Sequence, residues 1–191
     1  MRLLLILFIF LLVSCQSHSP SAKTIDMYNA TGDMVGTAKL TEQPEGVKVK
    51  LKVEGLSPGF HGVHIHEFPK CKAPDFKSAG NHFNPEGKKH GLMNPDGAHL
   101  GDMPNVEADG SGLVDGEIMI PEATLLDGNK SIVQKGTALV IDEKQDDGVT
   151  QPAGDSGTRI ICGEIKPEEK NANKEEPPTD PTDTEKQEKE D

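Results

Sequence analysis

Six of this chain's seven histidines lie between Gly59 and Asp102, in the segments GFHGVHIHEFPKC (59–71) and SAGNHFNPEGKKHGLMNPDGAHLGD (78–102). His64 and His66 are two residues apart in a segment with strand character. Because a strand repeats every two residues, both imidazoles leave the same face. Two potential ligands on one face of a strand favour a metal site.

After this strand the hydrophobic periodicity stops, and the chain becomes rich in Gly, Pro, Asn and Lys. A long loop without secondary structure is uncommon in a compact domain and needs an internal fastening. His82, His90, His99 and Asp102 offer one, since imidazole and carboxylate are ligands for zinc and copper, and three His with one Asp make an ordinary tetrahedral zinc site. The alternative is that these four are simply polar loop residues.

The rest of the chain predicts an all-β domain over residues 24–166. The clearest strand is VKVKLKV (47–53), where Val47, Val49, Leu51 and Val53 alternate with lysines, so that one face is core and the other is in water. Further strands are expected over 24–30, 34–41, 60–67, 113–120, 136–142 and 158–165, separated by turn residues. His61 has the opposite strand parity to His64 and is expected to face away from the metal.

The N-terminus reads MRLLLILFIFLLVSC and predicts a leader that is removed. Its apolar run from Leu3 to Val13 is shorter than the roughly 20 residues that span a bilayer. LVSC resembles the lipobox of bacterial lipoproteins, which predicts a signal peptide over 1–14 and a lipidated Cys15, with residues 16–23 as a linker. The protein would then be attached to the cell membrane on its extracytoplasmic face. A plain secretory signal with a spectator cysteine is the alternative.

The chain has three cysteines. If Cys15 carries lipid, Cys71 and Cys162 remain as a pair in an exported protein, where a disulfide is permitted. Two free thiols acting as soft metal ligands are the other interpretation.

The C-terminal segment differs from the rest of the chain in its charge. Residues 167–191 carry ten acids and four bases, a net charge of −6 and half of the chain's −12. This composition, without core-forming residues, predicts a disordered acidic tail. An acidic chain that lacks a basic stripe with aromatics gives no support to nucleic-acid binding.

Six blocks in order make residues 24–166 resemble the copper/zinc superoxide dismutase family. They are GFHGVHIHEF (59–68), GNHFNP (80–85), KKHG (88–91), HLGD (99–102), DEKQDD (142–147) and SGTRIICG (156–163). The resemblance implies a Greek-key β-barrel or sandwich of about eight antiparallel strands, with a long metal-binding loop and an electrostatic loop. It also implies dismutation of superoxide to dioxygen and hydrogen peroxide.

The family's site is carried over by position. Copper would be bound by His64, His66 and His82, and zinc by the set His82, His90, His99 and Asp102, with His82 as a bridging imidazolate. Two further positions match in the segment 142–159, which resembles the family's electrostatic loop: Asp146 would link a copper histidine to a zinc histidine, and Arg159 would dock the anionic substrate.

One position departs from the family pattern, because the fourth copper histidine is replaced by Asp142. A carboxylate is harder than imidazole and anionic, so it favours Cu(II) over Cu(I) and repels an incoming anion. Two hypotheses follow. The chain is an exported copper/zinc superoxide dismutase in which Asp142 or water completes the copper site, or it is a zinc-stabilised lipoprotein of the same fold with little or no activity.

Overall fold

The computed structural model describes residues 21–167 of the chain. Its strands are β1 (Ala22–Asn29), β2 (Met34–Gln43), β3 (Gly46–Val53), β4 (Gly59–His61), β5 (Val63–His66), β6 (Val106–Ala108), β7 (Val114–Pro121), β8 (Thr137–Asp142) and β9 (Arg159–Ile165), and one 3₁₀ turn, η1, spans Lys77–Ala79. The predicted all-β fold is confirmed. The leader, Cys15 and the acidic tail from residue 168 lie outside the described residues.

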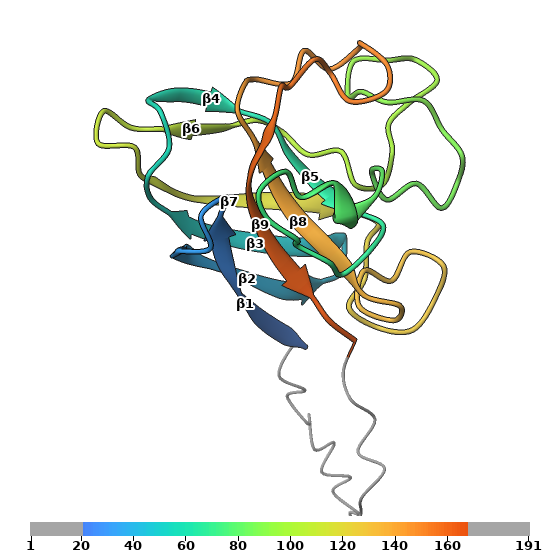
Figure 1. The fold of residues 1–191 in the computed structure, drawn as a ribbon. Helices are drawn as coiled ribbons and strands as arrows, with labels where there is room; N and C mark the ends of the chain where they lie inside the picture. The colour runs from blue at the N-terminus through green and yellow to red at the C-terminus, as the bar shows by residue number, and fades with distance from the viewer. Residues whose placement is uncertain (1–20, 168–191) are drawn as a thin grey trace, which may run out of the picture.

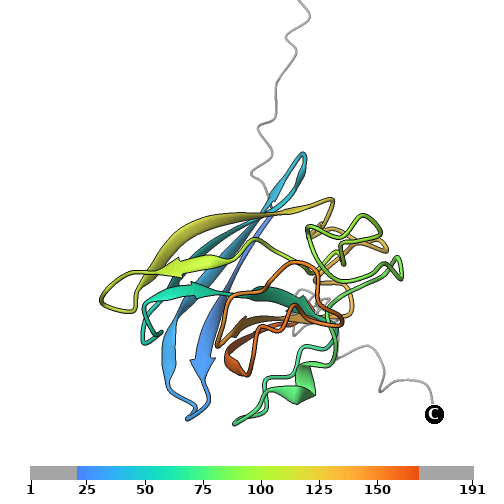
Figure 2. The same cartoon turned by 90° about the horizontal axis from the view of Figure 1, so that it is seen from above.

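Seven strands form one antiparallel sheet in the order β5-β8-β9-β1-β2-β3-β7, and β4 pairs with β6. The long sheet curls over a shared core, so its two halves face each other (Figures 1 and 2). The chain crosses between the ends of this sheet from β3 to β5, from β5 to β7 and from β7 to β8. Long crossings of this kind belong to Greek-key sheets.

The core follows the alternation read from the sequence. In β3, Val47, Val49, Leu51 and Val53 are at most 1% exposed and pack in the main hydrophobic cluster. The lysines between them face water. Burying each of these aliphatic side chains contributes about 1.5–3 kcal/mol, which makes β3 a main stabilising element of the sheet.

Two details of the strand prediction were wrong. The strand expected over 60–67 is divided at Gly62, which donates its N–H to Lys144 O at 2.8 Å instead of continuing a ladder. The strand β6 was not expected, since it has three residues and pairs only with β4. A segment this short is held by its partner and carries almost no periodic signal.

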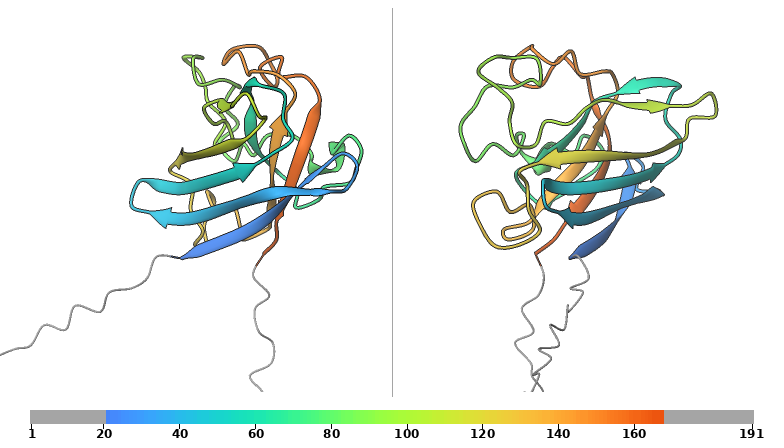
Figure 3. Two further views of the ribbon diagram at one scale, coloured as in Figure 1. Left: turned by 90° about the vertical axis from the view of Figure 1, so that its left-hand side faces the viewer. Right: turned by 180° about the vertical axis from the view of Figure 1, so that it is seen from behind.

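Two irregular segments are brought together at one end of the sheet. Residues 67–105 connect β5 to β6, and residues 143–158 connect β8 to β9. They lie side by side beyond β5 in Figures 1 and 3, joined by bonds such as Met93 N–H to Gly148 O at 3.1 Å. Within residues 21–167, no helix is long and apolar enough to cross a membrane.

Candidate metal centre

The edge of β5 that faces away from β8 is paired with the 67–105 segment. Ile65 N–H donates to Gly101 O at 2.9 Å, and Phe83 N–H donates to Ile65 O at 2.7 Å. Single bridges place His82 opposite His66 and Asp102 opposite His64. This backbone pairing positions loop side chains beside strand histidines that are far away in the sequence.

Three groups of buried or nearly buried donors result among the described residues, each with ligand atoms within 4.8 Å of one another. The first is His82, His90, His99 and Asp102; the second is His64, His66 and His82; the third is His64, His90 and Asp146. His82 belongs to the first two groups. Its ring stacks on His64 at 4.0 Å between centroids and meets the rings of His66 and His99 edge-on.

Asp102 is the centre of the first group. Its Oδ1 lies 2.8 Å from His82 Nδ1, 3.1 Å from His90 Nδ1 and 3.3 Å from His99 Nδ1. Its Oδ2 accepts the N–H groups of Gly91 and His99 at 2.8 and 3.0 Å. Three imidazoles converging on one fixed carboxylate form the donor set of a tetrahedral zinc site.

Two buried ring nitrogens indicate whether the first two donor groups could bind metal ions. Among the described residues, His66 Nε2 has no hydrogen-bond partner, and His99 Nδ1 forms no hydrogen bond of good geometry although Asp102 Oδ1 lies 3.3 Å away. His66 Nδ1 must donate to Gly80 O at 3.0 Å, because a carbonyl only accepts, and so the neutral ring keeps its lone pair on Nε2. A buried nitrogen with an unused lone pair is costly unless it binds something, so each group holds a nitrogen suited to a metal.

Asp146 connects the two sites. Its carboxylate lies 2.7 Å from His64 Nε2 and 3.2 Å from His90 Nε2, and the residue is 7% exposed. The other nitrogen of each ring, Nδ1, is thereby directed toward the candidate metal positions. Carboxylates that hold ligand histidines from behind fix the orientation of the ring.

The pKa values of the histidines diverge within this cluster. Burial lowers the pKa of His82 to about 4 despite its bond with Asp102, and burial together with neighbouring cationic groups lowers the pKa of His66 well below its usual value. Burial also opposes charge on His90, but hydrogen bonds with Asp102 and Asp146 raise its pKa to about 9. His66 and His82 are therefore neutral at physiological pH, which is the form that coordinates a metal.

Asp142 lies beside the second group but belongs to none of the three groups. It ends β8 at a register shift in the pairing with β9, and its Oδ2 lies 2.9 Å from His64 Nδ1. His64 therefore contacts one carboxylate with each ring nitrogen. Burial lowers the pKa of His64, but the bonds with Asp142 and Asp146 outweigh it and raise the pKa.

Arg159 begins β9 directly opposite Asp142. Its guanidinium donates to Phe76 O at 3.0 Å and to Gly80 O at 2.7 Å, the carbonyl that also accepts from His66. Burial lowers the pKa of Arg159, although its usual value is so high that the group stays charged. A cavity of about 340 Å³ is lined by Arg159 together with His82 and His99. The backbone bonds fix a cation at the rim of this cavity.

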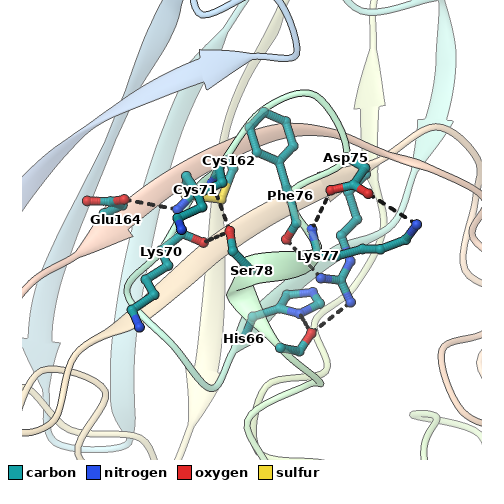
Figure 4. The surroundings of a disulfide bond; sticks show 12 residues. His66, Lys70, Cys71, Asp75, Phe76, Lys77, Ser78, Cys162 and Glu164 are labelled. Atoms are coloured by element: carbon teal, nitrogen blue, oxygen red, sulfur yellow. Dashed lines mark hydrogen bonds and ion pairs between the residues drawn. A yellow bond between two sulfur atoms is a disulfide. The ribbon is translucent and has the colours of Figure 1, made fainter.

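A disulfide joins Cys71 to Cys162, with an S–S distance of 2.00 Å. It ties the 67–105 segment to β9, three residues after Arg159, and Figure 4 shows it next to the turn that carries Phe76. Cys71 N–H also donates to Glu164 Oε1 at 2.9 Å. The expected pairing is confirmed, and the two sulfurs are not free thiols.

His61 lies outside the three donor groups, as expected, with its ring nitrogens 2.8 Å from the carbonyls of Ser57 and Asp142.

Three polar residues of the centre were missed in the sequence. The side-chain amide of Asn105 pairs with the backbone of Asp146 in both directions, at 2.8 and 2.9 Å. Gln151 likewise pairs with the backbone of His90, and Ser156 Oγ lies 2.9 Å from Asp142 Oδ2. Single uncharged residues in irregular segments have no period or spacing that marks them, so the sequence offers no signal for these contacts.

The sequence of the chain is similar to those of copper/zinc superoxide dismutases. The family model described as copper/zinc superoxide dismutase matches residues 34–165. Copper/zinc superoxide dismutase 2 of Aquifex aeolicus is 45% identical over 159 residues, which are 82% of this chain and 93% of the relative. The copper/zinc superoxide dismutase of Caulobacter vibrioides is 41% identical over 139 residues, 71% of this chain and 80% of the relative.

Solved structures of the same family superpose on the chain. A superoxide dismutase-like protein from Bacillus subtilis, in a double mutant that replaces a tyrosine and a proline by histidine, superposes with a TM-score of 0.73 at 41% identity, over 75% of this chain and 96% of that one. The copper/zinc superoxide dismutase of Brucella abortus gives 0.64 at 32% identity, over 76% and 99% of the two chains. On these findings the chain belongs to the copper/zinc superoxide dismutase family, whose cofactors are copper and zinc.

Proposed function

We propose that the protein dismutates superoxide outside the cytoplasm at a paired copper and zinc site. The observation that carries this proposal is the position of His82, which is shared by two groups of buried donors that each contain, among the described residues, a buried nitrogen without a well-formed hydrogen bond. Copper is assigned to His64, His66 and His82. Zinc is assigned to His82, His90, His99 and Asp102, the set whose donors suit tetrahedral geometry.

The residues of the centre have different roles in this proposal. A bound copper ion supplies the one-electron chemistry that converts two superoxide ions and two protons into dioxygen and hydrogen peroxide. Arg159 attracts and docks the anion, because its charge is held at the rim of the cavity that reaches His82. Asp146 holds His64 and His90 from behind, so the two sites share one support.

A second candidate function is supported by Asp142. Since His64 Nε2 is bonded to Asp146, Nδ1 is the nitrogen left for copper, and Asp142 contacts this same atom at 2.9 Å. An anionic oxygen at this position favours Cu(II) and opposes the approach of superoxide. In this alternative, the protein is a zinc-stabilised member of the family with little or no turnover.

Superoxide decay separates the two functions. The purified protein is loaded with zinc alone or with zinc and copper, and the decay of a superoxide pulse is followed by its absorbance. The enzyme hypothesis expects fast decay in the copper-loaded sample and the uncatalysed rate in the zinc-only sample. Equal rates in the two samples, with copper shown to be bound, would leave the alternative.

Replacing Asp142 by histidine supplies the donor that the family pattern has at this position. We expect Asp142→His to raise copper affinity and superoxide decay roughly tenfold or more, because a neutral imidazole supports both oxidation states and removes a negative charge next to His64. Chelator competition measures affinity, and pulse decay measures activity. Glu143→His is the matched control, since it adds a histidine at the adjacent, exposed position. An unchanged affinity in Asp142→His would mean that another group completes the copper site.

We also propose that the chain is exported and held by lipid at Cys15 on the extracytoplasmic face of the cell membrane. The lipobox-like LVSC and the short apolar run before it support export, as does a disulfide in the domain, since disulfides persist in oxidising compartments. Residues 16–23 would then be the linker, residues 24–166 the catalytic domain and residues 167–191 an acidic tail.

Lipidation predicts a change in fractionation. Wild-type protein expressed in a bacterial host is expected in the membrane fraction with an acylated N-terminus by mass spectrometry. The variant Cys15→Ser is expected to lose the acyl mass and to leave the membrane fraction. Recovery of both proteins in the soluble fraction, with no acyl mass on either, would support the plain secretory signal instead.

A further inference from the structure

Asp142 has a second polar neighbour at the copper position. Ser156 Oγ lies 2.9 Å from the same oxygen, Asp142 Oδ2, that contacts His64 Nδ1. Asp142 is 3% exposed and Ser156 is 4% exposed. Ser156 Oγ is also 2.9 Å from Ala153 O, but its single proton serves one acceptor, and a carboxylate is a stronger acceptor than a carbonyl.

Ser156 is held in place by its surroundings and not by Asp142 alone. Its carbonyl accepts the N–H of Lys144 at 2.8 Å, which fixes the 143–158 segment against the end of β8. On its other side, a Cβ added to Gly62 would lie 3.1 Å from Ser156 Cβ, so the serine is packed directly on the backbone between β4 and β5. The hydroxyl is therefore directed at the carboxylate by a fixed backbone.

Copper binding changes the partners of Asp142. A nitrogen that coordinates a metal cannot donate a hydrogen bond, so His64 Nδ1 cannot serve both copper and the carboxylate. Among the hydrogen bonds of residues 21–167, the one from Ser156 would then be the remaining side-chain bond to Asp142 Oδ2. A buried carboxylate that loses all of its donors is strongly destabilised.

We propose that Ser156 is a positioning residue for copper binding: its hydroxyl retains the Asp142 carboxylate when His64 turns from that carboxylate to the metal. This inference rests on the proposed function in one respect, the assignment of copper to His64. It also identifies a second residue, Ser156, that accompanies the replacement of the family's histidine by Asp142. A carboxylate replaces a histidine here, and a buried hydroxyl bonds to it.

The test is a double-mutant cycle on Cu(II) affinity in the zinc-loaded protein, measured by competition with a chelator. We expect Ser156→Ala to weaken Cu(II) binding about tenfold, the scale of one hydrogen bond to a charged group. In the Asp142→Ala background the same substitution is expected to have no effect. The Cu(II) electron paramagnetic resonance spectrum should change with Ser156→Ala only when Asp142 is present, and zinc affinity should stay within about twofold.

Thr158→Ala is the matched control, because it removes an exposed hydroxyl in the same segment that donates to Glu143 at 2.8 Å. It should leave Cu(II) binding unchanged. Equal losses from Ser156→Ala in both backgrounds, no loss in either, or tighter copper binding would each overturn the inference and leave the dismutase proposal intact. If the unaltered protein binds no Cu(II) at all, both proposals fail together.

Discussion

Removal of zinc is expected to lower the unfolding temperature of the protein by roughly 10 °C. The 67–105 segment has one three-residue 3₁₀ turn as its only regular structure, yet it buries His90 and Asp102. Zinc would bind the folded arrangement of these donors and not the unfolded chain, so it stabilises by mass action. With free zinc about a thousandfold above its dissociation constant, the gain is about 4 kcal/mol, and about 1 kcal/mol moves the midpoint by 2–4 °C in a domain of this size.

His99→Ala makes this test specific. His99 contributes to the zinc group alone, and without metal its Nδ1 has a single long contact, 3.3 Å from Asp102 Oδ1, so the metal-free variant should lose much less stability than the zinc-bound one. With zinc added, it should lose most of the stabilisation. Asp96→Ala, which removes an exposed carboxylate paired with Lys89 in the same segment, is the control that should keep the full shift. An identical midpoint with and without zinc in the wild-type protein would contradict the role of zinc as the fastening of this loop.

Strand periodicity predicted the parts of the centre that lie in strands. His64 and His66 share a face because they are two residues apart in β5. His61 lies elsewhere as expected, but the reason is different: the strand is divided at Gly62, and His61 ends β4 in the other sheet. The same rule predicted β3, where alternating residues are buried. A period of two residues is a property of the local backbone, and therefore a single sequence contains it.

The loop ligands are a different case. No local rule places His90 5.2 Å from His82 between ring centroids, because that distance depends on how residues 67–105 run along the edge of β5. In the sequence these residues are recognisable only as metal-binding types with a suggestive spacing and a family resemblance. Asn105 and Gln151 had neither, and Ser156, although it begins the block SGTRIICG, is not a metal-binding type. Each acts through one or two hydrogen bonds to another segment.

Asp142 shows what the sequence could and could not predict at one position. The change from histidine to a carboxylate is visible by comparison with the family pattern, and its preference for Cu(II) follows from ligand hardness. Its orientation is not visible. The end of β8 directs the carboxylate at His64 and Ser156, outside the group formed by His64, His66 and His82. As placed, Asp142 is a hydrogen-bond acceptor for His64 and Ser156.

Replacing His82 by alanine is expected to reduce superoxide decay by at least about 100-fold, the upper end of what loss of an outer-shell partner costs a metal site. His82 is 7% exposed, is stacked on His64 and lies in both metal groups, so no neighbouring residue can take its place. Burial lowers its pKa to about 4, which keeps the ring neutral and available to metals throughout the physiological range. The variant should lose bound copper and part of its bound zinc, measured by elemental analysis.

His66→Ala separates the two roles of His82. His66 belongs to the copper group and not to the zinc group, so this variant should lose copper and activity while it retains zinc and the zinc-dependent unfolding temperature. Met93→Ala, at an uncharged loop residue that is 70% exposed, should match wild type in activity and in both metals. Full activity in His82→Ala would show that the shared imidazole is not required, and loss of zinc from His66→Ala would show that the two groups do not act as separate sites. This pattern is expected only if the His82 ring binds at both metal positions, because the other donors of the copper group and of the zinc group are different residues.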